Sequence, residues 1–104
     1  MKRPVSWSSS ARNDYFAIIR YIADRNPDAA ERVADKIEEA VDSLSDFGTG
    51  RAGRVQGTYE KVLASLPYII AYEIIRQPEG DEMISILHVV HGARDWPAGQ
   101  WPSE

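Results

Sequence analysis

The dipeptide Asn26-Pro27 constrains the fold of this chain more than any other feature, because it interrupts a long helical pattern and restarts it at once. Asparagine is a good helix cap, and proline at the first helical position has no amide hydrogen to leave unpaired. Before this point three serines, Ser8 to Ser10, offer another helix cap. The sequence therefore predicts two helices joined by a very short link.

Both predicted helices have one apolar face. Apolar residues recur at three- and four-residue spacing, which is typical of amphipathic helices. In the first segment they are Ala11, Tyr15, Ile18, Ile19 and Ile22, and in the second Ala30, Val33, Ile37, Val41 and Leu44. Gly48 is the expected C-cap of the second helix. So short a link between two such helices predicts an antiparallel hairpin.

The remaining segments predict strands. Residues 3–7 include Pro4, which a sheet tolerates only at an edge, so they predict a short edge strand. Residues 58–63, 68–75 and 83–90 are rich in β-branched and aromatic residues, and residues 77–81 form a turn sequence. We therefore expect an α+β fold: a short N-terminal edge strand and an antiparallel helical hairpin packed on one face of a C-terminal antiparallel sheet.

Length and charge limit the classes of protein to consider. The 104 residues fit one domain, 1–104, and the absence of cysteine fits a reducing cytoplasm. No apolar run spans a bilayer, and the N-terminus lacks the apolar core of a signal peptide. The net charge of −4 disfavours indiscriminate nucleic-acid binding. Between Gly48 and Lys61, however, Arg51, Arg54 and Lys61 oppose only Glu60, which indicates a local cationic loop.

Three patterns have a functional and a structural interpretation. Residues 48–53 match G-x-G-x-x-G, but they follow a helix and lead into strands, so a dinucleotide site is not expected. Arg51 and Arg54 on this loop suit a phosphate or carboxylate, or else an ion pair with the acidic helices. His88 and His91 alternate to opposite faces of a strand, which disfavours a shared metal. We expect neither a metal nor a cofactor.

Aromatic residues offer a second set of interpretations. Tyr68 and Tyr72 share one strand face, where core packing is the usual explanation and a functional phenol the alternative. Trp96 and Trp101 lie on a polar tail, residues 95–104, where they either fold back onto the domain or contact a partner.

Several short motifs occur in order along nearly the whole chain. They are Trp7-Ser8, Ala11-Arg12, Asp14, Tyr21-Ile22-Ala23, Asn26-Pro27, Ala29-Ala30, Gly53-Arg54-Val55, Gly57-Thr58, Leu66-Pro67-Tyr68-Ile69-Ile70-Ala71-Tyr72 and His91-Gly92-Ala93-Arg94-Asp95-Trp96-Pro97. The ordered set resembles ParE-type toxins of the RelE/ParE type II toxin–antitoxin superfamily. The resemblance implies a single toxin domain, an acidic antitoxin of ParD-like or similar type as partner, contact with operator DNA only through that antitoxin, and a role in growth inhibition or plasmid stabilisation.

The chain departs from the family's pattern at three positions. Tyr59 stands where relatives with Gly57-Thr58 usually continue with arginine, and Glu73 and His88 stand where many carry arginine. These departures indicate a toxin that is less basic than its relatives. A weakened toxin that acts only by binding its antitoxin is therefore one interpretation.

The chemistry that each activity needs favours one candidate target over the other. RNA cleavage requires a base, cations for the phosphorane and an acid, for which the available side chains are Arg54, Lys61, His91 and Arg94. The strand 68–75 carries no basic residue, where RNA-cutting relatives usually place one, and the pI of about 5.1 disfavours docking on ribosomal RNA. DNA gyrase inhibition, which needs no catalytic set, is the preferred hypothesis, and messenger RNA cleavage on the ribosome is the alternative. We expect target contacts from Arg51, Arg54, Tyr72, His91, Arg94 and Trp96.

Overall fold

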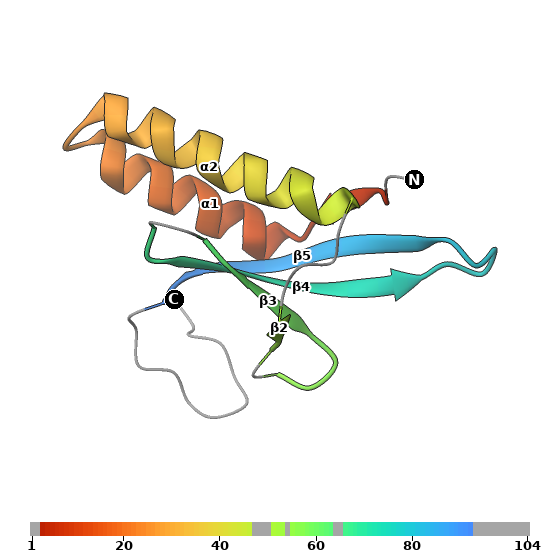
Figure 1. Cartoon of the computed structure of the whole chain (residues 1–104). Helices are drawn as coiled ribbons and strands as arrows, with labels where there is room; N and C mark the ends of the chain where they lie inside the picture. The colour runs from red at the N-terminus through yellow and green to blue at the C-terminus, as the bar shows by residue number, and fades with distance from the viewer. Residues whose placement is uncertain (1–2, 47–50, 54, 64–65, 93–104) are drawn as a thin grey trace.

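Two consecutive helices form the hairpin that the Asn26-Pro27 pair predicts. The computed structural model describes residues 3–46, 51–53, 55–63 and 66–92 (Figure 1). Helix α1 spans Ser9–Ala23 and α2 spans Pro27–Asp46. Ser8 Oγ accepts a hydrogen bond from the Ala11 amide at 3.0 Å, and Asn26 Oδ1 accepts one from the Ala29 amide at 3.1 Å. Both predicted N-caps are confirmed, whereas the expected C-cap Gly48 lies outside the described residues.

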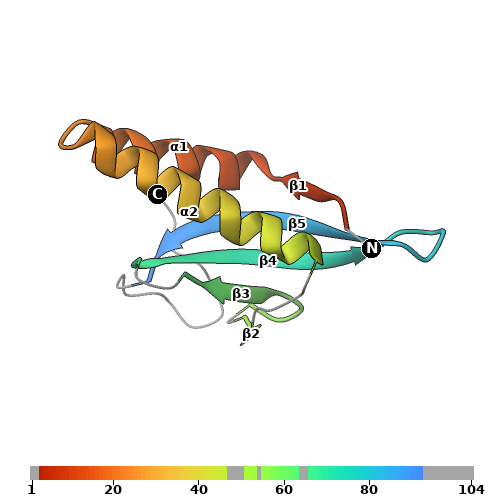
Figure 2. The ribbon, with the colours of Figure 1, turned by 45° about the horizontal axis from the view of Figure 1, so that its top comes forward.

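In the described part of the chain, five strands form one sheet. They are β1 (Val5–Trp7), β2 (Arg51–Ala52), β3 (Tyr59–Val62), β4 (Tyr68–Arg76) and β5 (Glu82–His91), in the order β1-β5-β4-β3-β2. The predicted edge strand and the antiparallel C-terminal sheet are confirmed, since β2 to β5 pair antiparallel. The pairing of β1 with β5 is parallel, which makes the complete sheet mixed (Figure 2). The two-residue strand β2 lies within the segment interpreted from sequence as a loop.

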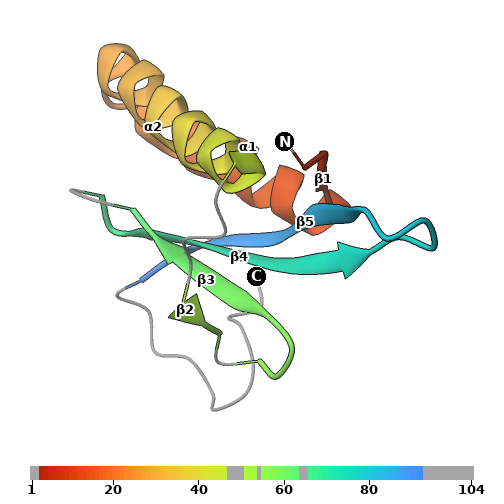
Figure 3. The same cartoon turned by 45° about the vertical axis from the view of Figure 1, so that its right-hand side comes forward.

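The hairpin covers one face of the sheet, as Figure 3 shows from the side. Helix α1 lies against β5, and α2 contacts β1. The largest fully buried side chains lie at this interface: Ile37 and Leu44 from α2, and Ile70, Tyr72, Ile84 and Ile86 from the sheet. Complete burial of one such aliphatic side chain stabilises a fold by about 1.5–3 kcal/mol. Neither described helix is both long and apolar enough to cross a bilayer.

A β-bulge at Leu87 decides which residues of β5 enter the core. Ala71 pairs with His88 and Tyr72 pairs with Ile86, so Leu87 is an extra residue on β5. Side chains alternate along a strand, and a bulge shifts that alternation by one position. Beyond the bulge it is therefore Val89, only 2% exposed, that joins Ile86 on the helix-covered face. The bulge keeps His88 out of the apolar core.

Candidate functional site

The end of the sheet where β4 begins and β5 ends brings two aromatic rings together. Tyr68 pairs with His91 in the β4–β5 register, and their ring centroids lie 5.6 Å apart in an edge-to-face arrangement. The Gly92 amide donates to the Pro67 carbonyl at 2.7 Å and closes this end of the strand pair. Burial raises the pKa of the Tyr68 hydroxyl, and the neighbouring Tyr21 raises it further. Tyr68 therefore holds its proton and remains a hydrogen-bond donor.

The C-terminal part of α1 supplies two more side chains to this end of the molecule. Tyr21 is 61% exposed, although its electrostatic effect on Tyr68 places it near the strand end. The guanidinium carbon of Arg25 lies 4.0 Å above the centre of the Tyr21 ring, and its Nη1 donates to the Tyr21 carbonyl at 3.1 Å. We call Tyr21, Arg25, Tyr68 and His91 the sheet-end cluster. It combines exposed aromatic surface with a positive charge, which is common where proteins bind a partner.

Of the residues predicted from sequence, His91 lies in the sheet-end cluster, but Lys61 and Tyr72 lie elsewhere. Lys61 is half-buried on β3 and pairs with Ile70. Tyr72 is fully buried, and its ring stacks on that of Tyr59 at 5.6 Å. The Tyr72 ring packs against the Tyr59 ring, and because Tyr72 is fully buried it cannot contact a partner in this structure.

The structure describes only some of the cationic residues that were predicted from sequence to bind the target. Arg54, Arg94 and Trp96 lie outside the described residues. The backbone of Arg51 is described. Arg51 lies on β2 and pairs with Glu60 of β3, and strands β3 and β4 lie between β2 and β5. Three strand spacings amount to about 14 Å, so the Arg51 backbone is distant from His91. A joint patch of Arg54, His91 and Arg94 remains a prediction.

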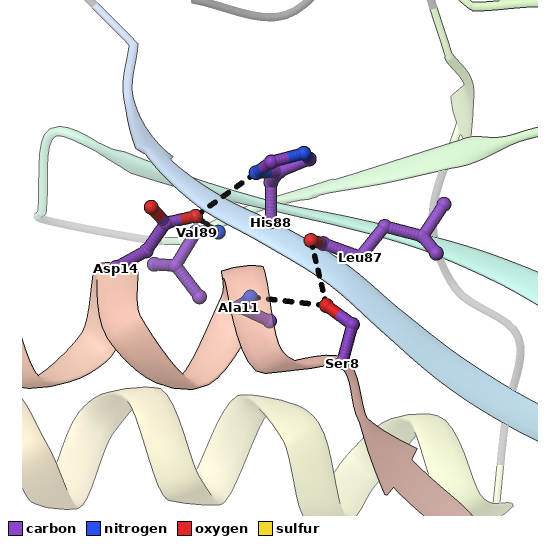
Figure 4. A network of polar contacts seen from close by, with 6 residues as sticks. All are labelled: Ser8, Ala11, Asp14, Leu87, His88 and Val89. Atoms are coloured by element: carbon purple, nitrogen blue, oxygen red, sulfur yellow. Dashed lines mark hydrogen bonds and ion pairs between the residues drawn. The ribbon is translucent and has the colours of Figure 1, made fainter. Parts of the chain in front are cut away.

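His88 is part of a polar network that fastens α1 to β5 (Figure 4). Its Nδ1 lies 3.1 Å from Asp14 Oδ2, and the same oxygen accepts the Val89 amide hydrogen at 3.0 Å. Ser8 Oγ donates to the Leu87 carbonyl at 3.0 Å, one residue before His88. His88 therefore orders the bulge region. Within the ranges that the structure describes, no three His, Asp or Glu side chains are grouped closely enough to hold a metal ion.

A separate cleft of about 350 Å³ opens between β1 and the two helices, and sequence analysis did not identify it. Its lining combines three aromatic rings with two charged side chains: Trp7, Arg12, Tyr15, Phe16 and Glu38. Trp7 and Tyr15 lie edge-to-face at 5.5 Å between ring centroids, and Tyr15 and Phe16 do so at 5.6 Å. We call these five residues the α1 cleft. The one sequence signal for it is Phe16, an aromatic residue on the polar side of the α1 pattern.

Comparison with known proteins gives consistent results. The family model described as "ParE toxin of type II toxin-antitoxin system, parDE" matches residues 5–96. The putative toxin Y4kP of Sinorhizobium fredii is 40% identical over 97 residues, which cover 92% of this chain and 95% of the relative. Toxin RelE2 of Caulobacter vibrioides is 31% identical over 90 residues, covering 86% of this chain and 96% of the relative.

Two solved structures share the fold. A chain of the chromosomal ParDE system from P. aeruginosa superposes with a TM-score of 0.75 at 21% identity, covering 86% of this chain and 96% of that one. A chain of the toxin–antitoxin complex RelBE2 from Mycobacterium tuberculosis superposes with a TM-score of 0.54 at 23% identity, covering 88% and 99%. Both solved structures therefore share with this chain the fold in which a helical hairpin packs on one sheet.

Proposed function

This chain belongs to the ParE toxin family of type II toxin–antitoxin systems, and from that premise we propose that it arrests growth in the cytoplasm by binding DNA gyrase until an acidic antitoxin neutralises it. The observation that favours gyrase as the target is the absence of basic residues from Tyr68 to Ile75 of β4. From Tyr68 to Ile75 this central strand presents apolar side chains and Glu73, and its terminal Arg76 lies 3.6 Å from Glu82. Arg76 is the one basic residue of β4, and it lies at the end of the strand opposite the Tyr68–His91 pair, so β4 supplies no cation near His91 to stabilise a phosphorane.

The positions of the described basic groups on the sheet also support a binding function. RNA cleavage needs a base, an acid and cations around one phosphate. His88 is engaged by Asp14, His91 packs edge-on against Tyr68, and Lys61 lies on β3, two strands away from β5. A gyrase inhibitor needs only a surface, which the sheet-end cluster offers.

Ribosome-dependent cleavage of messenger RNA is the second candidate function, because one relative of 31% identity is named as toxin RelE2. A third interpretation is a protein that binds its antitoxin without being toxic. Tyr59 favours it, because this ring stacks on Tyr72 at the position where family members with Gly57-Thr58 usually continue with arginine. Glu73 adds a negative charge to β4.

One induction experiment separates these functions. The chain is expressed without antitoxin while DNA synthesis, RNA synthesis and transcript integrity are followed separately. The gyrase proposal predicts that DNA synthesis stops first and DNA-damage signalling follows, while transcripts remain intact. Rapid transcript cleavage on ribosomes would instead identify the RNA-cutting activity, and folded protein without any growth arrest would identify the antitoxin-binding interpretation.

An assay with purified proteins tests directly whether gyrase is the target. The protein is added to gyrase and relaxed plasmid at micromolar concentration, and supercoiling and cleaved plasmid are measured. We expect inhibition that co-purified antitoxin from the neighbouring gene reverses. If supercoiling proceeds unchanged at every concentration tested, gyrase is not the target.

A further inference from the structure

The two helices of the hairpin carry exposed rows of opposite charge. On α1 three exposed side chains follow one another at four-residue spacing: Arg12, Phe16 and Arg20. On α2 four exposed side chains recur at three- and four-residue spacing: Glu31, Asp35, Glu38 and Asp42. Residues at these spacings share one stripe of a helix. We call the first set the basic row and the second set the acidic row.

Both rows border the same surface of the hairpin. Arg12 and Phe16 of the basic row and Glu38 of the acidic row all line the α1 cleft. The Tyr15 hydroxyl donates to Glu38 Oε2 at 2.7 Å and connects the two helices there. Figure 2 shows α1 and α2 side by side. The basic and acidic rows are therefore neighbours on one exposed face.

The bond between Tyr15 and Glu38 also fixes which residues of the two helices lie level with each other. The helices are antiparallel and rise equally per residue, so five residues forward on α1 correspond to five residues back on α2. Arg20 is therefore level with position 33, between Glu31 and Asp35. The same count places the other arginine of the basic row level with the C-terminal end of the acidic row.

These levels make the face complementary to itself. A two-fold axis parallel to the helices keeps every residue at its level and places α1 of each copy over α2 of the other. Arg20 of one copy then faces Glu31 and Asp35 of the other copy, and the symmetry forms this contact twice. A two-fold axis across the helices would instead place the basic row on itself, where like charges repel. Charge therefore selects one arrangement of two copies.

Phe16 supplies an apolar contact in the same arrangement. Its side chain is 54% exposed and lies level with Glu38, which lines the α1 cleft of the other copy. That cleft has a volume of about 350 Å³ and contains the half-buried rings of Trp7 and Tyr15. An exposed aromatic side chain facing a preformed hollow is a typical anchor between proteins. Two such anchors occupy one symmetric interface.

The size of the face indicates a weak, reversible association. Helix α1 has 15 residues. With a rise of about 1.5 Å per residue and a width of about 10 Å for each helix, the face measures roughly 450 Å² per copy. Specific interfaces of this size are at the low end of the usual range. We therefore expect exchange between monomer and dimer at micromolar concentration.

We propose that two copies of this chain associate through the hairpin, with the basic row of each copy on the acidic row of the other. This inference is independent of the target. Because the two-fold axis is parallel to the helices, both sheet-end clusters, which include Tyr21 and Arg25 of α1, lie at the same end of the dimer. The dimer therefore presents that surface twice, on one side.

The test uses two full-length variants with reversed charges, studied by sedimentation equilibrium without antitoxin. One variant combines Arg12→Glu with Arg20→Glu, and the other combines Glu31→Arg with Asp35→Arg. Each alone should dimerise at least about 30-fold more weakly than the parent chain, because like charges then face each other in both contacts. An equimolar mixture should associate again, because each reversed row meets the opposite charge on the other variant.

A matched control keeps the charge change but moves it off the face. Arg32→Glu with Lys36→Glu gives the same net charge as Arg12→Glu with Arg20→Glu. These exposed positions follow Glu31 and Asp35 by one residue, which is about 100° around the helix. This control should dimerise like the parent chain.

A further variant changes no charge. Phe16→Ala removes the apolar anchor and should weaken association at least about tenfold. Thermal midpoints of all variants should stay close to that of the parent chain, since the altered side chains are exposed.

Four results would overturn the proposal. The first is a parent chain that stays monomeric up to its highest soluble concentration. The second is parent-like dimerisation of either charge-reversed variant, which would place the contact elsewhere. The third is a pair of folded, monomeric variants whose mixture does not associate, which would contradict the pairing of α1 with α2. The fourth is parent-like association of Phe16→Ala, which decides even where a charge-reversed variant unfolds.

Discussion

Asp14 Oδ2 and His88 Nδ1 lie 3.1 Å apart, although 74 positions separate the two residues in the chain. The same carboxylate oxygen accepts the Val89 amide hydrogen at 3.0 Å. This amide lies just beyond the bulge at Leu87, on the part of β5 that extends past the three-residue strand β1. Asp14 thus connects the first helix to the last strand and satisfies a strand-edge donor that no neighbouring strand reaches.

Removing this carboxylate is expected to destabilise the fold strongly. Asp14→Ala leaves the Val89 amide without its partner, and the Asp14 side chain is only 12% exposed. Hydrogen bonds to charged groups are worth about 1.5–3 kcal/mol, so the free energy of unfolding should fall by that amount. His88→Ala should have a smaller effect because the amide bond remains. Urea unfolding measures both, with Glu39→Ala on the exposed face of α2 as control. Equal losses in Asp14→Ala and Glu39→Ala would show that the network adds nothing.

Tyr15 predicts a change of stability at alkaline pH. Its pKa is raised from 10.0 to about 12 in the folded chain, first by burial and then by the hydrogen bond to Glu38. The unfolded chain therefore loses this proton at lower pH than the folded chain. The resulting stabilisation is complete below pH 10 and disappears as the pH rises through 12. The difference in unfolding free energy between the parent chain and Tyr15→Phe should be constant at neutral pH and decrease across this window. A constant difference up to pH 12 would contradict the assignment.

Local signals predicted most of the fold. The caps Ser8 and Asn26 act within their own helices, and the apolar spacing of α2 reports its buried face directly. Strand β4 is recognisable from composition alone, since a buried strand needs β-branched and aromatic residues. These elements were predicted correctly because each depends on residues within a few positions of one another.

Features that depend on distant residues were not predictable from the chain. Ile86 and Val89 are three positions apart on β5, yet both pack in the same core while β5 pairs with β4. The extra residue Leu87 makes this possible. The parallel pairing of β1 depends on where the hairpin returns the chain. For the same reason Tyr21 and Arg25 were missed, because only the tertiary fold places Tyr21 near Tyr68. For Tyr72 the sequence left both core packing and target contact open, and its complete burial favours core packing.

Gly53 is predicted to be required for the β2–β3 connection. A Cβ at this position would lie 2.5 Å from Thr58 Oγ1 and 3.1 Å from the Thr58 carbonyl oxygen, which accepts the Gly53 amide hydrogen at 2.8 Å. Gly53→Ala should therefore destabilise the fold by about 1–3 kcal/mol. The double variant Gly53→Ala with Thr58→Ala should lose less than the sum of the two single changes, because the closer clash is gone. Strict additivity in thermal unfolding would indicate that Gly53 is not limited by Thr58.

Target binding is predicted to depend on His91 at the strand end, on Arg94 three residues after it, and on Arg54 of the cationic loop. Arg54→Ala, His91→Ala and Arg94→Ala should each reduce growth arrest at least about tenfold in dose. A cationic contact to a partner is worth roughly 1–3 kcal/mol, whereas an exposed ion pair contributes only about 0–1 kcal/mol to folding. Thermal midpoints should therefore change little. Arg76→Ala is the matched control, because its side chain is 75% exposed and lies at the opposite end of β4.

The same variants separate target binding from antitoxin binding. Changes at His91 should weaken growth arrest while the antitoxin still binds, because the strand end is assigned to the target. Antitoxin affinity by calorimetry and growth arrest by titrated induction are measured for the same set of proteins. If His91→Ala and Arg94→Ala remain fully toxic, or lose toxicity only together with their thermal midpoint, the strand end is structural and the target must bind elsewhere. If His91→Ala instead loses antitoxin affinity and stays toxic, the strand end belongs to the antitoxin interface.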